Sequence, residues 1–210
     1  MNEGQITERA LTLAEMAPHE SVTVDLLAGR DGRFSPGPPL NEPPVTYLES
    51  TEAPAYVLTN GKRGIGLGTK RNTVSPSGDR RTIVLVSGRR TLCLVGQADG
   101  DEIVEIPHDA VVSVSYKTGF RANRIALRTP QKTYHCWIHR KAEESLLEAA
   151  TAFVEDHKRE TPEAIDGDDD ANRVMYRGRP VTRDVLDDTS AADSDQTVTY
   201  RGQPVDDSSE

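Results

Sequence analysis

The sequence predicts a mainly β domain, a bent antiparallel barrel capped by one C-terminal helix. Two observations carry this prediction. Short runs rich in β-branched residues follow one another at roughly the 8 to 12 residue spacing that is typical of sandwiches and barrels. They then lead directly into one amphipathic segment with helical periodicity. The expected strands are residues 55–59, 82–87, 91–95, 102–106, 111–116, 124–128 and 133–139.

Glycine and proline mark the turns between these runs. Gly88 separates 82–87 from 91–95, and Gly100 precedes 102–106. Glycine supplies the positive φ that tight hairpin turns need. Pro107 ends its strand because it has no N–H to donate to a neighbouring strand. We therefore expect consecutive runs to pair as antiparallel neighbours.

Residues 141–157 have the pattern of a helix with one buried face. Apolar side chains recur at helical spacing, and glutamates take the other positions. We expect this helix to cover the open end of the barrel, whose interior would otherwise face water at a cost of about 25 cal/mol per Å². The expected apolar stripe is Ala142, Leu146, Ala149, Ala150, Phe153 and Val154.

Composition divides the chain into three parts. With 35% hydrophobic residues, 5% aromatic residues and 13 prolines, the chain is too poor in apolar side chains to be packed along its whole length. Residues 1–53, 54–158 and 159–210 carry net charges of −6, +5 and −8. We expect a flexible N-terminal extension at 1–44, with a short helix and a Pro/Gly linker. A domain at 45–158 follows, and then a disordered acidic tail at 159–210.

The composition also bears on the habitat and the compartment. Arginine outnumbers lysine 19 to 6 and aspartate is abundant, which indicates either a salt-adapted source or a GC-rich genome with acidic tails. The chain has no run of 18 apolar residues, and its first residues lack the basic start and apolar core of a signal peptide. We expect a cytoplasmic protein that is at most peripheral to a membrane.

The segment between the first two strands, residues 60–81, is rich in glycine and in basic residues. Such a loop lets backbone N–H groups approach a phosphate while the cations neutralise its charge. Thr69 stands where a P-loop or a dinucleotide fingerprint needs glycine, so neither motif is present. The segment is therefore either an ordinary surface loop or an anion site. The candidate anion-binding residues are Lys62, Arg63, Lys70, Arg71, Arg80 and Arg81.

The histidines near the last strand do not predict a metal site. His135 and His139 would lie roughly 13 Å apart along a strand, too far to share an ion. Cys136 would point to the opposite face from both, and we expect Tyr134, Cys136 and Ile138 to face the core. We expect no metal and no other cofactor.

Catalytic patterns are missing from the sequence as well. The serines of the expected strands lack a Gly-x-Ser-x-Gly setting, and no His-Glu-x-x-His motif is present. Asp99, Asp101 and Glu102 form a turn cluster that we expect to be solvated. Cys93 and Cys136 are expected to be small buried residues, and a disulfide between them stays open. We expect a protein that is not an enzyme.

The domain resembles the bacterial pleckstrin-homology-like (PH, or GRAM-like) domains. The resemblance lies in residues 82–96, 106–114, 124–128 and 133–138 with the final helix, and it covers residues 45–157. It implies a strongly bent antiparallel sheet closed at one corner by the helix, in a non-catalytic module that binds lipid headgroups, peptides or proteins. In this family the loop after the first strand often carries the basic ligand-binding residues, and this position corresponds to Lys62, Arg63, Lys70 and Arg71.

The tail contains a short internal repeat. Residues 174–181 return at 198–205, 24 residues later, with six identities in eight positions. Two copies are too few for a solenoid. They are either adhesive elements whose linkage raises avidity for a protein partner, or a duplication without use, or short strands that pair or dock on their own domain. The candidate partner-binding residues are Tyr176, Arg177, Gly178, Tyr200, Arg201 and Gly202.

Two classes of function remain. The first is a binding or scaffold module that recruits an unknown protein partner with the help of the tail. The second is an anion site at residues 60–81 for a lipid headgroup or for nucleic-acid phosphate. A net charge of −9 and the small number of aromatic rings stand against nucleic acid. We expect the first class, because a high-salt habitat would screen phosphate binding.

Overall fold

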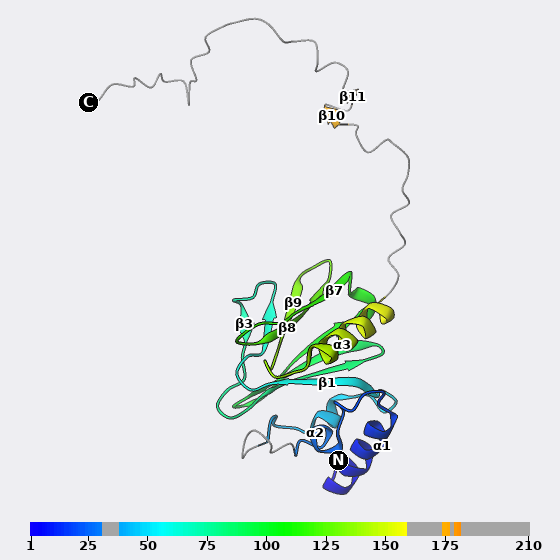
Figure 1. The fold of residues 1–210 in the computed structure, drawn as a ribbon, viewed down its shortest axis with the longest axis vertical. Coiled ribbons are helices and arrows are strands. Elements are labelled where there is room, and N and C mark those ends of the chain that lie inside the picture. The colour runs from blue at the N-terminus through cyan, green and yellow to red at the C-terminus, as the bar shows by residue number, and fades with distance from the viewer. Residues whose placement is uncertain (31–37, 159–173, 177–178, 182–210) are drawn as a thin grey trace, which may run out of the picture. The chain divides into compact units, whose positions relative to one another are not determined.

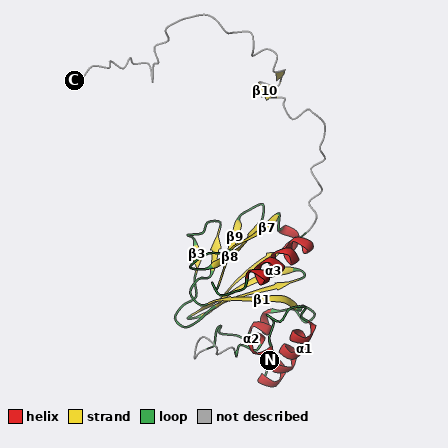
Figure 2. Ribbon diagram, in the orientation of Figure 1, coloured by secondary structure: helices red, strands yellow, loops and turns green. Residues whose placement is uncertain are grey.

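The structure is a computed structural model that describes residues 1–30, 38–158, 174–176 and 179–181. The chain divides into two units, Met1–Thr161 and Pro162–Glu210. The described part of the first unit is mainly β, with two antiparallel sheets (Figures 1 and 2). Its helices are α1 (Glu3–Met16), α2 (Val24–Leu27) and α3 (Glu144–His157), with the 3₁₀ turns η1 (Pro44–Tyr47) and η2 (His108–Ala110).

The first sheet has the strand order β1-β4-β5-β6 and the second has the order β3-β2-β9-β8-β7. All neighbouring strands in both sheets are antiparallel. The strands are β1 (Pro54–Asn60), β2 (Ile65–Leu67), β3 (Thr73–Val74), β4 (Thr82–Ser87), β5 (Arg90–Gln97), β6 (Gly100–Pro107), β7 (Ser113–Lys117), β8 (Asn123–Arg128) and β9 (Thr133–Ile138). The seven strands expected from the sequence are thus confirmed, and the short strands β2 and β3 lie inside the segment that was expected to be a loop.

The main core lies between the two sheets and beneath α3. Val84 and Val86 of the first sheet, together with Ile125 and Leu127 of the second, join one apolar cluster with α3. The helix buries Leu147, Ala150 and Val154 in this cluster. Leu146 and Phe153 of the expected stripe are only partly buried against it, and Leu147, which the stripe omitted, is fully buried. The capping helix is confirmed, with Leu147 in place of Leu146 on its buried face.

The expectation of a closed barrel is wrong. Within residues 38–158 the two sheets do not close, because β6 and β7 pair with β5 and β8 and not with each other. The chain passes from β6 to β7 through Pro107 and η2, and α3 packs against β7 and η2 at this side. At the opposite side the sheets approach each other, where the N–H of His139, just after β9, donates to the Thr59 carbonyl of β1 at 2.8 Å. The result is a two-sheet sandwich covered by a helix.

The N-terminal segment is not a flexible extension in its described part. Ala10 and Leu13 of α1 and Leu27 of α2 are buried against the outer face of the first sheet, where they meet Ile83 and Leu85. In Figure 1, α1 and α2 lie on the far side of β1 from α3. A four-stranded sheet that is apolar on both faces needs a cover on each of them. The N-terminal residues provide the second cover.

Asp101 ties this N-terminal segment to β6. Its carboxylate accepts hydrogen bonds from the Tyr47 hydroxyl at 2.6 Å and from the backbone N–H groups of Asn41 and Glu42 at 2.8 and 3.1 Å. Burial alone would raise the pKa of Asp101, but these hydrogen bonds, with that of Tyr47 the strongest, lower it below its usual range. The expectation that this carboxylate is merely solvated was wrong.

The two cysteines lie opposite each other in the core. Cys93 of β5 and Cys136 of β9 are free thiols, both fully buried, with their Sγ atoms 3.3 Å apart. Ile138 is also fully buried, and Tyr134 packs against the same cluster. The expected inward face of β9 is therefore confirmed.

The described part of the second unit is one short antiparallel pair, β10 (Val174–Tyr176) with β11 (Arg179–Val181). These two strands flank the centre of the first tail repeat. Among the residues described by the structure, no helix has both the length and the apolar character that a membrane span requires.

Candidate anion-binding site

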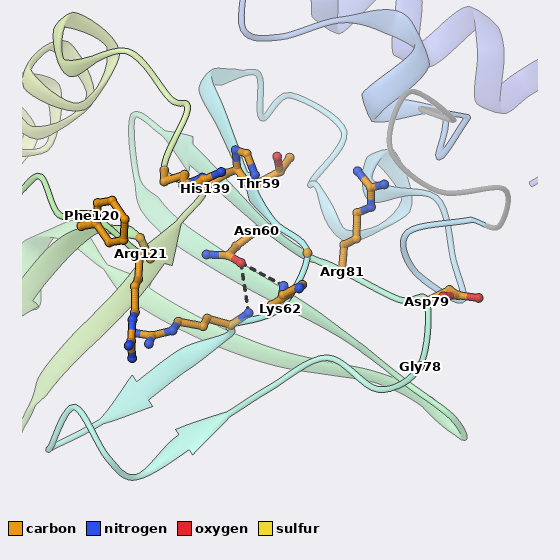
Figure 3. Close-up of a pocket in the computed structure, with 13 residues that line it drawn as sticks. Thr59, Asn60, Lys62, Gly78, Asp79, Arg81, Phe120, Arg121 and His139 are labelled. Atoms are coloured by element: carbon orange, nitrogen blue, oxygen red, sulfur yellow. Dashed lines mark hydrogen bonds between the residues drawn. The ribbon is translucent and has the colours of Figure 1, made fainter.

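A pocket of about 800 Å³ lies where four segments of the first unit meet (Figure 3). These segments are the end of β1 with the turn into β2, the β3–β4 loop, the β7–β8 loop, and the residues after β9. A pocket of this volume can hold a small ligand. Its lining residues are Thr59, Asn60, Gly61, Lys62, Arg63, Gly78, Asp79, Arg81, Phe120, Arg121, Ala122, His139 and Arg140.

Asn60 holds the turn that carries two of the cations. It is 5% exposed, and its Oδ1 accepts hydrogen bonds from the backbone N–H groups of Lys62 at 2.9 Å and Arg63 at 3.0 Å. Both bonds are drawn in Figure 3. This local turn is a common role of asparagine. At Gly64 a Cβ would lie 1.7 Å from the carbonyl oxygen of Val74, so glycine is required where the chain leaves the turn.

The end of β9 supplies the facing wall. The His139 N–H donates to the Thr59 carbonyl at 2.8 Å, which fixes His139 and Arg140 beside the end of β1. Burial, followed by the positive charges of Lys141, Arg140 and Arg81, lowers the pKa of His139. These three cations give the wall a positive potential.

Cations outnumber carboxylates around the pocket. Five basic side chains and one carboxylate, Asp79, are among the described lining residues. Figure 3 shows Phe120 and Arg121 on one side of Asn60, with Arg81 and Asp79 on the other. Phe120 is 89% exposed, an unusual state for a phenylalanine. The cations are Lys62, Arg63, Arg81, Arg121 and Arg140.

The structure brings together some of the anion-binding candidates and separates others. Lys62, Arg63 and Arg81 line the pocket. Lys70 and Arg71 are exposed in the turn between β2 and β3 and do not belong to its lining. The six residues therefore do not all line one pocket.

Arg80 does not line this pocket, and its side chain instead contacts residues 40–41. Its guanidinium donates to the Leu40 carbonyl at 2.5 Å and to the Asn41 side-chain oxygen at 2.7 Å. It thus holds the segment that follows the Pro/Gly-rich stretch against the first sheet.

Sequence reasoning missed Arg121, Arg140 and Phe120, which lie 39 residues or more beyond the glycine-rich segment. One signal was present in the sequence. Residues 110–142 contain seven lysines and arginines and no aspartate or glutamate, although the whole chain is acidic. An acid-free stretch in such a chain indicates a surface that attracts anions.

The structure describes only one of the six candidate partner-binding residues, Tyr176. Arg177, Gly178, Tyr200, Arg201 and Gly202 lie outside the described residues. Tyr176 ends β10 and pairs with Arg179 of β11. Among the described residues, no three His, Cys, Asp or Glu side chains gather to hold a metal ion.

No protein-family model matches the chain, and no curated protein matches it. Among solved structures, the Vps36 N-terminal PH domain is similar at 17% sequence identity with a TM-score of 0.38. The match covers 52% of this chain and 83% of that one. A likeness at this level assigns neither a family nor a ligand, and the PH-like or GRAM-like family stays a prediction.

Proposed function

We propose that this chain is a non-catalytic binding module whose basic pocket takes a phosphate-bearing anion. The single observation that carries the proposal is the convergence of five cations from four segments on one pocket that has one carboxylate among its described lining residues. Guanidinium groups bind phosphate with paired, charge-assisted hydrogen bonds.

The ligand source is either a free phosphate compound or the headgroup of a lipid. Both present the same chemistry to the pocket. The exposed ring of Phe120 at the rim fits either source, because an apolar ring beside cations can enter the interfacial region of a bilayer or stack on the base of a nucleotide.

Calorimetric titration of the full chain tests the proposal. Pyrophosphate and a soluble inositol trisphosphate should each bind with one-to-one stoichiometry, and binding should weaken as salt is raised. Vesicles with and without a phosphorylated inositol lipid then separate the two sources. Absence of binding by either soluble probe at low salt would refute the anion pocket.

Recruitment of a protein partner remains the second candidate function. It is supported by the pairing of β10 with β11, which gives the first repeat a local structure of its own. Deleting residues 160–210 should then abolish capture of the partner, whereas changing the pocket cations to glutamine should leave it intact. The opposite pattern would exclude the tail as the recruiting element.

A further inference from the structure

The outer face of the five-stranded sheet is built from small and basic residues. Register places Lys117 opposite Arg124, and Arg124 opposite Trp137. The next row of the same face contains Ser115, Ala126, His135 and Gly66, and a third row contains Ser113, Arg128 and Thr133. The five strands of this sheet, all within residues 65–138, contain no aspartate or glutamate.

Part of this face is open to solvent. Ser113, Ser115 and Lys117 along β7 are all exposed, as is Arg128 on β8. The described N-terminal residues cover the other sheet, and α3 lies with the core between the sheets. The exposed part of the face runs along β7 and the end of β8, whereas Gly66, Ala126 and His135 in its middle row are buried.

Trp137 lies in this face with two guanidinium groups near its ring. The Cζ atom of Arg63 lies 4.6 Å from the centroid of the indole ring, and that of Arg124 lies 5.9 Å from it. Arg63 also lines the anion pocket, so the pocket and the sheet face are continuous. The cluster combines planar aromatic and guanidinium groups with positive charge.

This combination is what an unpaired nucleotide strand requires. Bases stack on aromatic rings and on guanidinium planes, while lysine and arginine neutralise the phosphates between them. The bases of a duplex are stacked on each other and cannot use such a platform. A bilayer surface needs apolar anchors, and the open face of β7 and β8 offers serine, alanine, lysine and arginine in place of them.

We propose that the outer face of the five-stranded sheet binds single-stranded nucleic acid, with Lys117, Arg124 and Arg128 at the phosphates and the stacked pair of Arg63 and Trp137 beneath a base. The inference rests on the proposed function, because it names the phosphate-bearing partner and extends the pocket across the sheet. It revises the argument against nucleic acid made from aromatic content, since the fold places the sole tryptophan of the chain among the cations.

The test uses the full chain and labelled single-stranded oligonucleotides of about ten nucleotides, within the usual site sizes of single-strand binders. Fluorescence anisotropy gives the affinity for oligo-dT and oligo-U, and a duplex of the same length is the comparison. Because Trp137 is the only tryptophan, quenching of intrinsic fluorescence reports stacking directly. Quenching should follow the same binding curve as the anisotropy.

The variant Lys117→Gln/Arg128→Gln removes two exposed cations from the face. We expect at least a tenfold loss of oligonucleotide affinity and a salt dependence shallower by about 1.4 in log K against log salt. Arg89→Gln is the control for a single lost charge, because Arg89 is 71% exposed in the β4–β5 turn of the other sheet. It should change affinity less than twofold.

Three results would overturn the inference. The first is no binding of either oligonucleotide at low salt while pyrophosphate still binds the pocket, which would leave the proposed function standing. The second is equal binding of duplex and single strand without quenching. The third is binding only to anionic vesicles. If pyrophosphate also fails to bind, the proposed function fails independently.

Discussion

Acidification should destabilise the fold through His108, which is buried in a neutral state. The side chain is 1% exposed, its Nε2 lies 2.9 Å from the Thr91 hydroxyl oxygen, and its Nδ1 has no hydrogen-bond partner among the described residues. Burial, with a smaller contribution from His157, lowers its pKa from 6.5 to about 4, and Asp109 opposes the shift weakly. The folded chain therefore protonates His108 only at a lower pH than the unfolded chain does.

The unfolded chain takes up this proton near its ordinary pKa of 6.5, whereas the folded chain does so only near 4. The stabilising contribution of the neutral His108 is therefore fully present above about pH 6.5, and it is lost as the pH falls toward 4. Between pH 7 and pH 4.5 the shift corresponds to a loss of about 2 kcal/mol from this one group. His135 and His139 have lowered pKa values and add to the loss in the same direction.

Urea denaturation at pH 7 and pH 4.5 measures this loss, and the comparison is with His108→Gln. Glutamine keeps a donor near the Thr91 hydroxyl but does not titrate. The variant should be less stable at pH 7, and its stability should fall by about 2 kcal/mol less between the two pH values than that of the parent chain. An identical fall in both proteins would show that His108 does not titrate between these pH values.

The remaining predictions concern packing. Leu147→Ala should cost about 3 kcal/mol by urea denaturation and Leu146→Ala about 1 kcal/mol, because only Leu147 is fully buried; the reverse order would contradict the observed helix face. Glu52→Gln should cost about 2 kcal/mol, since it removes the buried one of the two carboxylates that pair with Arg90 and leaves only the half-exposed Glu105, and a cost below about 0.5 kcal/mol would count against the pair. Gly96→Ala should speed proteolysis of residues 38–48, because a Cβ there would lie 2.7 Å from the Pro39 carbonyl oxygen; unchanged cleavage would speak against this packing.

The sequence predicts those elements whose signal is local. The β-branched run at 82–87, the glycine turn after it and the amphipathic helix each show their periodicity within one segment. The inward face of β9 followed from simple alternation, and Cys136 and Ile138 are fully buried as expected. The sequence predicted Leu146 on the buried face, whereas the structure buries Leu147. Both leucines border the same apolar stripe, and only packing against the sheets determines which of them is buried.

The N-terminal cover had a signal that was not used. Ile83, Val84, Leu85 and Val86 make an unbroken apolar run, which is expected when both faces of a strand are buried. One face belongs to the core beneath α3. The other needed a partner, and the stripe of Ala10 and Leu13 provides it.

The candidate site could be predicted only in part, because its charges come from separate segments. Lys62 and Arg63 were found from the glycine-rich loop, and Arg81 from its far end. Arg121 and Arg140 reach the same pocket through the pairing of β8 with β9 and of β9 with β2. No local sequence pattern predicts that these residues line one pocket, because this depends on the pairing of strands that are far apart in the chain.

The central claim is that phosphate binds the pocket and not the glycine-rich loop as such. Two double variants decide this by calorimetry with pyrophosphate at low salt. Lys62→Gln/Arg140→Gln removes two exposed cations from the pocket, and Lys70→Gln/Arg71→Gln removes two exposed cations from the neighbouring β2–β3 turn. The account predicts at least a tenfold loss of affinity for the first variant and less than a twofold loss for the second. Equal losses, or a larger loss for the second variant, would contradict it.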